Sequence, residues 1–294
     1  MKSTSWPLAV QHHLNDHCGD ILAIETLSDK SGAQVTRLQF AGQSLILKQS
    51  RTSAEADFYE HIAPILRTYG IALPAVEAII HDSSGHWLVI EDIPTPLPRD
   101  RWFGDPEILS LLAQLHSLEP TAIPPLANGY VPQWSNDLTE KALACFDNAA
   151  APTLYDVQSR CQHLFDSDCW ISADPNPGNW GLRADGTSVL FDWERFTQAA
   201  PAVDLAIVSP VYGTVDQYRS TAATYIEQRQ VMNRPYPVVL EPLTRDIIFA
   251  KLWTLVEFLS LYTDGKLEPD TTLTYLTEGL PVWLSALEIV SILK

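Results

Sequence analysis

The chain has 294 residues, of which 46% are hydrophobic and 19% are charged, as in an ordinary folded globular protein. Its formal net charge of −17 at pH 7 argues against nucleic acid and anionic membranes as partners. No hydrophobic run is long enough to span a bilayer, and residues 1–20 lack a signal-peptide core, so we expect a cytoplasmic protein. The negative charge would suit an amine-bearing substrate, although solubility explains it equally well. The oligomeric state stays open.

Residues 5–18 predict a short helix that ends at Gly19. His13 and His17 lie four residues apart, about one helical turn, and Cys18 follows directly, so a metal site is conceivable. The sequence supplies no obvious fourth ligand, and a polar helix face explains the same residues. The four cysteines, Cys18, Cys145, Cys161 and Cys169, show no C-x-x-C spacing and are expected to be reduced thiols.

Residues 21–49 alternate between apolar and polar side chains and predict a three-stranded meander with turns at 28–32 and 41–43. The first turn contains Ser31 and Gly32, whose backbone N–H groups are able to cradle a phosphate. With one glycine, this turn is a weak phosphate-loop signal. Lys48 ends the third strand. By itself it fits a lysine at a strand end that reaches into water.

Residues 52–67 predict a helix, and its apolar face is formed by Phe58, Ile62 and Ile65. Thr52 and Glu55 have the spacing of a capping box, in which Glu55 would bond the helix start. Two strands are expected next, at 73–76 and 87–90, with a turn at 82–85. Three prolines, Pro94, Pro96 and Pro98, then break the strand pattern and predict a linker.

The rest of the chain is predicted to be mostly helical. Helices are expected at 107–118, within 136–167 with a break near 151–152, and at 215–228, 243–262 and 273–293. His116 in the first of these helices is expected to be a packed structural residue.

The segment from Cys169 to Ala206 carries the most informative pattern. Asp174 and Asn179 lie on one loop, and Asp192 follows the apolar run 189–191. A turn at 184–186 predicts a hairpin that brings Asp192 close to Asn179. An amide and a carboxylate on rigid backbone are oxygen ligands of the kind that Mg²⁺ prefers. Asp174 lies outside that pair, where it is available to accept a hydroxyl proton.

Three motifs in this segment resemble the aminoglycoside phosphotransferase and choline kinase family, the small-molecule branch of the kinase fold. They are Asp174-Pro-Asn-Pro-Gly-Asn179, Leu190-Phe-Asp192-Trp-Glu194 and Pro201-Ala-Val-Asp204-Leu-Ala206. The family pattern begins His-Gly-Asp, and this chain has Ser172-Ala173 before Asp174. That departure puts the rigidity of the loop in doubt, although Pro175 and Pro177 restrict its backbone.

The resemblance implies an α+β, protein-kinase-like bilobal fold, with a small β-rich N-lobe and a larger, mainly helical C-lobe. The N-lobe would comprise residues 1–93 and the C-lobe residues 94–294.

The resemblance also implies ATP-dependent phosphorylation of a hydroxyl group on a small molecule. Asp174 would be the catalytic base, and Asn179 and Asp192 would hold Mg²⁺. Lys48 would contact the α- and β-phosphates, held there by Glu55, which starts the family-like motif Glu-Ala-Asp-Phe-Tyr. The turn with Ser31 and Gly32 would cover the phosphates, and Glu91 to Ile93 would meet the adenine edge. Asp204 would anchor the loop.

Two alternatives remain at this stage. The Ser172-Ala173 departure and the glycine-poor turn motivate a non-catalytic nucleotide-binding or regulatory protein of kinase fold. A protein kinase is less consistent with the sequence, because Asp192 has no Phe-Gly after it and lies only 12 positions before Asp204. The sequence does not fix the acceptor. We expect an amine on it, with Glu257 as a candidate contact.

Overall fold

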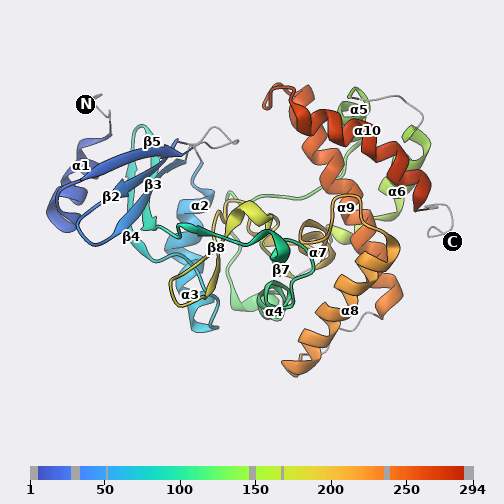
Figure 1. The fold of residues 1–294 in the computed structure, drawn as a ribbon, viewed down its shortest axis with the longest axis horizontal. Coiled ribbons are helices and arrows are strands. Elements are labelled where there is room, and N and C mark those ends of the chain that lie inside the picture. Colours follow the sequence, from blue (N-terminus) through green and yellow to red (C-terminus); the bar gives the residue numbers. More distant parts are fainter. Residues whose placement is uncertain are drawn as a thin grey trace. The chain divides into compact units, whose positions relative to one another are not determined.

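A computed structural model describes residues 6–27, 34–50, 52–145, 150–166, 169–234 and 239–287 (Figure 1). The chain divides into two compact units. The first comprises 1–97, 124–130 and 178–195, and the second comprises 98–123, 131–177 and 196–294. The predicted domains are two consecutive pieces that meet at 93–94. The observed division instead groups the hairpin segment 178–195 with the N-terminal sheet.

The first unit contains a five-stranded antiparallel sheet with the strand order β1-β2-β3-β5-β4. Its strands are β1 (Ala23–Leu27), β2 (Gln34–Gln39), β3 (Ser44–Ser50), β4 (Val76–Asp82) and β5 (Gly85–Glu91). The predicted meander at 21–49 is therefore confirmed. The predicted strand at 73–76 is wrong except for its last residue. Pro74 has no N–H to donate to a neighbouring strand, which disfavours strand pairing there.

The central strand β3 has two faces with different surroundings. Leu45 and Leu47 of β3 belong to a core cluster with Val10 and Leu14 from the N-terminal helix. Ile46 and Lys48 point to the opposite face, because successive side chains of a strand alternate. Alternate side chains of β3 thus pack against the N-terminal helix on one face and line a cavity on the other.

Two helical segments of the first unit, near the N-terminus and after β3, contain a π-helical turn. The N-terminal helix α1 (Leu8–His13) continues through a π turn at Leu14–Cys18 and ends at Gly19, whose φ is 84°. The predicted helix at 52–67 is observed as α2 (Ala54–Asp57), a π turn at Phe58–Ile62, and α3 (Ala63–Thr68). No side-chain hydrogen bond caps α2, so the capping-box alternative for Glu55 is not realised.

A smaller sheet of the first unit has the order β6-β8-β9, formed by β6 (Thr95–Pro96), β8 (Trp180–Leu182) and β9 (Ser188–Leu190). The predicted hairpin is present, and its turn uses Gly186 at φ 86°. Glycine is also required at 181, since a Cβ there would lie 2.6 Å from Ile93 Cγ2. The close approach fixes β8 against the segment that follows β5.

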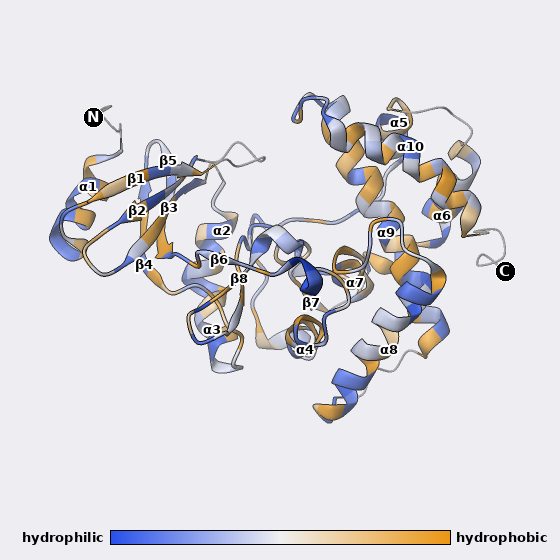
Figure 2. Ribbon diagram, viewed as in Figure 1, coloured by the Kyte–Doolittle hydropathy of each residue, from blue (hydrophilic) through white to orange (hydrophobic). Residues whose placement is uncertain are grey.

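The second unit is mainly helical. Its helices are α4 (Pro106–Leu115), α5 (Asn136–Leu143), α6 (Ala151–Arg160), α7 (Ala202–Ile207), α8 (Val215–Val231), α9 (Leu240–Thr263) and α10 (Thr271–Ala286). Strand β7 (Trp170–Ile171) pairs with β10 (Thr197–Gln198). Helix α9 packs against α5, α7 and α8, and Figure 2 shows hydrophobic residues along it. Within the described residues, no helix is both long and apolar enough to cross a membrane.

Candidate active site

A cavity of about 320 Å³ in the first unit contains most of the predicted nucleotide-binding residues of that unit. Its apolar lining comes from Leu27, Val35, Ile46, Ile90, Ile93 and Phe191, and its charged lining from Arg37, Lys48, Glu55, Glu91, Asp92 and Asp192. Its volume lies within the usual range of small-molecule pockets. The predicted phosphate turn with Ser31 and Gly32 falls outside the described residues.

Lys48, Glu55 and Asp192 form a buried charge cluster in this cavity. Lys48 Nζ lies 2.8 Å from Glu55 Oε2 and 2.8 Å from Asp192 Oδ1. The side chains of Lys48 and Glu55 are 8% and 1% exposed, and that of Asp192 is 27% exposed. The ammonium group of Lys48 thus binds a carboxylate, that of Asp192, which is 144 positions away in the sequence.

Burial and charge act in opposite directions on this cluster. Desolvation lowers the pKa of Lys48, but attraction to Glu55 and Asp192 outweighs it, so the net pKa is raised and the ammonium stays charged. Burial raises the pKa of Glu55 to about 7, despite the opposing attraction of Lys48, and repulsion from Asp192 adds to that rise. Lys48 is therefore a fixed positive charge held by two carboxyl groups.

The hairpin places Asp192 at a defined position beside Asn179. Trp180 and Leu190 are cross-strand partners, and Phe191 N–H donates to the backbone carbonyl of Asn179 (2.9 Å). Trp193 stacks on Phe58, with ring centroids 4.8 Å apart and planes 6° apart. The residues on both sides of Asp192 are thus held by packing and hydrogen bonding.

Asp174 lies in the second unit, on a loop anchored by Asp204. Asp204 is fully buried in α7, and its carboxylate accepts hydrogen bonds from Ser172 N–H (2.9 Å) and Ala173 N–H (2.7 Å). Asn176 Nδ2 donates to Asp174 Oδ1 at 2.8 Å. The chain passes from the second unit to the first between Pro177 and Gly178, so Asp174 and Asn179 belong to different units.

His116 has a role that the sequence did not reveal. Its Nε2 lies 3.0 Å from Asp204 Oδ2, and its Nδ1 lies 3.2 Å from the Tyr225 hydroxyl. His116 is buried at the C-cap of α4, as expected for a packed residue, and it links the end of α4 and helix α8 to the loop anchor. No spacing rule signals this contact, because His116 and Asp204 are 88 residues apart.

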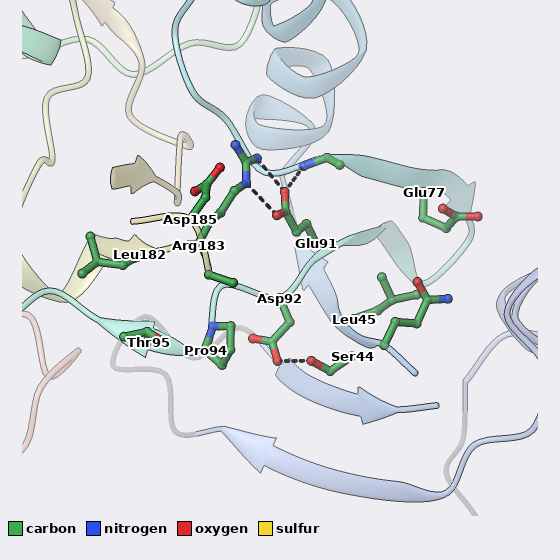
Figure 3. A pocket seen from close by; sticks show the side chains of 13 residues that line it. Ser44, Leu45, Glu77, Glu91, Asp92, Pro94, Thr95, Leu182, Arg183 and Asp185 are labelled. Carbon is green, nitrogen blue, oxygen red and sulfur yellow. Dashed lines mark hydrogen bonds and ion pairs between the residues drawn. The ribbon is translucent and has the colours of Figure 1, made fainter. Parts of the chain in front are cut away.

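Two further ion pairs flank the segment after β5. Arg37 Nε donates to Asp92 Oδ2 (2.7 Å), and Arg183 Nε donates to Glu91 Oε1 (2.7 Å). The hydrogen bonds from Arg183 hold the pKa of Glu91 below its usual value. Figure 3 shows Glu91, Arg183 and Asp92 around a second cavity of about 660 Å³. This cavity is larger but lacks Lys48 and Asp192, so we take the smaller cavity as the candidate nucleotide site.

Comparison with known proteins places the chain in a family. The model of the phosphotransferase enzyme family matches residues 23–240. The chain belongs to this phosphotransferase family. No curated protein sequence matches it significantly.

Solved structures that are similar to this chain share its fold at low sequence identity. A putative aminoglycoside phosphotransferase from Ralstonia eutropha JMP134 has a TM-score of 0.66 at 13% identity, over 95% of this chain and 96% of that one. A spectinomycin phosphotransferase in complex with ADP and spectinomycin has a TM-score of 0.61 at 14% identity, over 94% and 93%. A choline kinase from Streptococcus pneumoniae has a TM-score of 0.58 at 15% identity, over 94% and 98%.

These likenesses confirm the predicted α+β, protein-kinase-like fold class. Family and fold together point to a small-molecule phosphotransferase.

Proposed function

We propose that the protein transfers the γ-phosphoryl group of ATP to a hydroxyl group of a small molecule. The observation that carries this proposal is the buried cluster of Lys48, Glu55 and Asp192 in a cavity with an apolar and a charged lining. The apolar lining is suited to a purine ring, and a lysine fixed in the charged lining is suited to phosphate oxygens.

The residues present fit a requirement for Mg²⁺. The positive charge of Lys48 is shared between two carboxyl groups, so Lys48 alone attracts a polyphosphate weakly. Asp192 and Asn179 supply a carboxylate and an amide oxygen, the hard ligands that suit this ion. Bound there, Mg²⁺ would neutralise charge on the phosphates.

Asp174 has the chemistry to act on the acceptor. Its carboxylate would orient the acceptor hydroxyl and take its proton as the oxygen bonds to the γ-phosphorus and the bond from phosphorus to the ADP oxygen breaks. The proton then passes to solvent. Asn176 and the loop anchored by Asp204 hold this carboxylate in one orientation.

The test is ADP release with a panel of amino alcohols, sugars and aminoglycosides, followed by two variants. Asp174→Asn keeps the shape of the side chain and removes its charge, so ATP affinity should stay near the parental value. Turnover should fall by about 10²–10⁴-fold. Asp192→Ala should remove the Mg²⁺-dependent part of the thermal stabilisation by ATP. Full activity of Asp174→Asn would exclude the proposed role of this residue, and equal ATP binding in EDTA would exclude the metal role.

A non-catalytic nucleotide-binding protein is the second candidate, motivated by Ser172-Ala173 in place of the His-Gly of the family pattern. Ala173 has a left-handed φ of 61° at the position where the family pattern has glycine. That candidate predicts thermal stabilisation of the parent by ATP but no single-turnover transfer to any acceptor.

We expect the acceptor to carry an amine, because the net charge of −17 attracts cations. For an amine acceptor, KM should rise with ionic strength as the attraction is screened. Glu257→Gln should raise KM and flatten this salt dependence. As a matched control, Glu278→Gln on α10 should leave both unchanged. A neutral acceptor with a salt-insensitive KM would exclude this assignment.

A further inference from the structure

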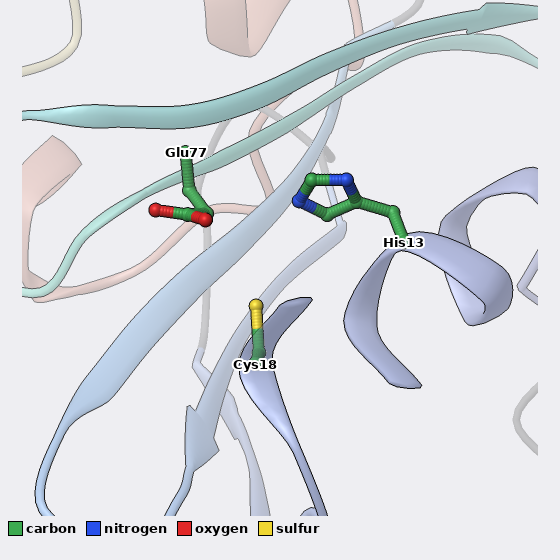
Figure 4. Close-up of side chains that lie close together, drawn as sticks. All are labelled: His13, Cys18 and Glu77. Atoms are coloured by element: carbon green, nitrogen blue, oxygen red, sulfur yellow. The ribbon is translucent and has the colours of Figure 1, made fainter. Parts of the chain in front are cut away.

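A cluster of His13, Cys18 and Glu77 lies on the first unit, outside the candidate active site. One imidazole nitrogen, the thiol sulfur and one carboxylate oxygen all lie within 4.8 Å of one another. Figure 4 shows the three side chains directed into the same space, His13 and Cys18 from the N-terminal helical segment and Glu77 from β4. None of the three residues lines the candidate nucleotide cavity.

The π-helical turn explains why His13 and Cys18 come together. Residues five apart on an α-helix point about 140° away from each other, whereas in a π turn they lie on the same face. The turn Leu14–Cys18 follows His13 directly, and Gly19 N–H donates to the carbonyl of Leu14 (3.1 Å), five residues back. The backbone irregularity therefore aligns two good metal ligands that a regular helix would separate.

Glu77 reaches the cluster from a second irregularity. The pairing of β4 with β5 shifts register between Val76 and Ala78, so Glu77 sits at a break in the regular pairing, of which a β-bulge is one form. Bulges redirect side chains and recur beside functional sites. Two independent departures from regular backbone thus converge on one group of potential ligands.

His13 supplies the observation that points to a ligand. Its Nε2 atom is buried and has no hydrogen-bond partner within the described part of the chain. A buried polar atom without a partner costs free energy, and a bound cation would satisfy it. His17 is not part of the cluster: its Nδ1 bonds to the carbonyl of His13 (3.1 Å), and its ring stacks on that of His13.

We infer that His13, Cys18 and Glu77 bind a zinc-like divalent cation that fastens α1 to the sheet edge. Nitrogen, sulfur and carboxylate oxygen are the ligand types of Zn²⁺, and three protein ligands leave the fourth tetrahedral position to water. A tetrahedral centre holds its ligand atoms about 3.3–3.7 Å apart. The ligand atoms of the observed cluster, which lie within 4.8 Å of one another, would move closer together on binding the ion. The bound ion would join α1 and β4, two elements that already pack together.

Cobalt titration of the metal-free protein tests this site, because a cobalt–thiolate bond gives a characteristic charge-transfer absorption. The expected result is one equivalent of Co²⁺ bound with that absorption, displaced by Zn²⁺, and a higher melting temperature with Zn²⁺. Cys18→Ser should abolish the absorption. Glu77→Gln, at an exposed position that leaves folding intact, removes a direct ligand and should weaken binding by at least the about 10–100-fold that loss of an outer-shell partner costs.

Two control variants separate this cluster from other candidates. Cys145→Ser removes a different thiol, and His86→Gln breaks the pair in which His81 Nδ1 and His86 Nδ1 lie 2.7 Å apart. Both controls should keep the absorption and the thermal stabilisation by Zn²⁺. The inference is overturned if the parent binds no Co²⁺ with thiolate absorption. It is also overturned if Cys18→Ser and Glu77→Gln bind as the parent does, or if a control loses the signal instead.

Discussion

Two residues of the segment 169–206, Ala173 and Asp192, have left-handed backbone conformations, with φ of 61° and 64°. Such a conformation costs a non-glycine residue roughly 1–2 kcal/mol, and it persists where the surroundings enforce it. At Ala173 the enforcing contact is the hydrogen bond to Asp204. At Asp192 it is the charge cluster with Lys48, together with the packing of Trp193 on Phe58. The strain therefore falls on Asp192, a proposed metal ligand, and on Ala173, which directly precedes the proposed base Asp174.

Ala173→Gly should remove strain and should not lower the free energy of unfolding by more than about 0.5 kcal/mol. Relief of the left-handed φ offsets the lost methyl burial and the extra entropy of the unfolded chain. Ala223→Gly, on the exposed face of α8, is the matched control and should cost about 1 kcal/mol. Urea denaturation of both variants checks the difference. An equal loss in the two variants would contradict the strain at Ala173.

The loop that carries Asp174 owes its shape to a helix rather than to its own sequence. Helix α7 presents the carboxylate of Asp204 to two consecutive backbone N–H groups, and His116 at the C-cap of α4 approaches the same carboxylate. Each element fixes the next, so the loop and its helices form one positioning unit.

Asp204→Asn should disturb this unit, because an amide offers only one acceptor oxygen to two N–H groups. An unsatisfied buried donor costs about 1–3 kcal/mol, and the displaced loop should lower kcat with little change in KM for ATP. Asp105→Ala, at the start of α4, removes the side-chain cap of Glu107 N–H and Ile108 N–H and should cost about 1 kcal/mol of stability while leaving kcat unchanged. If the two variants have the same kcat, Asp204 does not position Asp174.

At the scale of the whole molecule, a buried lysine couples stability to pH. Lys251 lies in the core of the second unit on α9, and its Nζ donates to the carbonyl of Ser209 (3.0 Å). Desolvation lowers the pKa of Lys251 to about 7, well below its ordinary value of 10.5. The unfolded chain therefore binds one more proton than the folded protein between about pH 7 and pH 10.5.

In that interval the free energy of unfolding should rise with pH by up to about 1.4 kcal/mol per unit from Lys251. Lys251→Met should remove this contribution and stabilise the protein most at pH 7 and below. Denaturation at pH 7.0 and pH 9.5 measures the slope, and Lys266→Met on the surface should keep the parental slope. A slope that survives in Lys251→Met would show that the amine stays charged in the fold.

The local pattern of residues in the sequence determines many of the secondary-structure elements of this protein. The meander, the long helices, the hairpin and the three linked motifs follow from side-chain periodicity and turn residues, which act over a few neighbouring positions. Those motifs also indicated the phosphotransferase family, because recognising them requires only the order and spacing of residues along the chain. The assigned roles of Asp174, Asn179 and Asp192 remain predictions that the proposed variants test.

Tertiary structure decided what depends on distant partners. The contact of Lys48 with Asp192 joins residues 144 positions apart, and that of His116 with Asp204 joins residues 88 apart. The alignment of His13 with Cys18 results from a π turn, which the periodicity of the sequence does not predict. Pairings of this kind depend on burial and on how elements pack. Side-chain spacing along the chain carries information only about neighbours on one strand or helix.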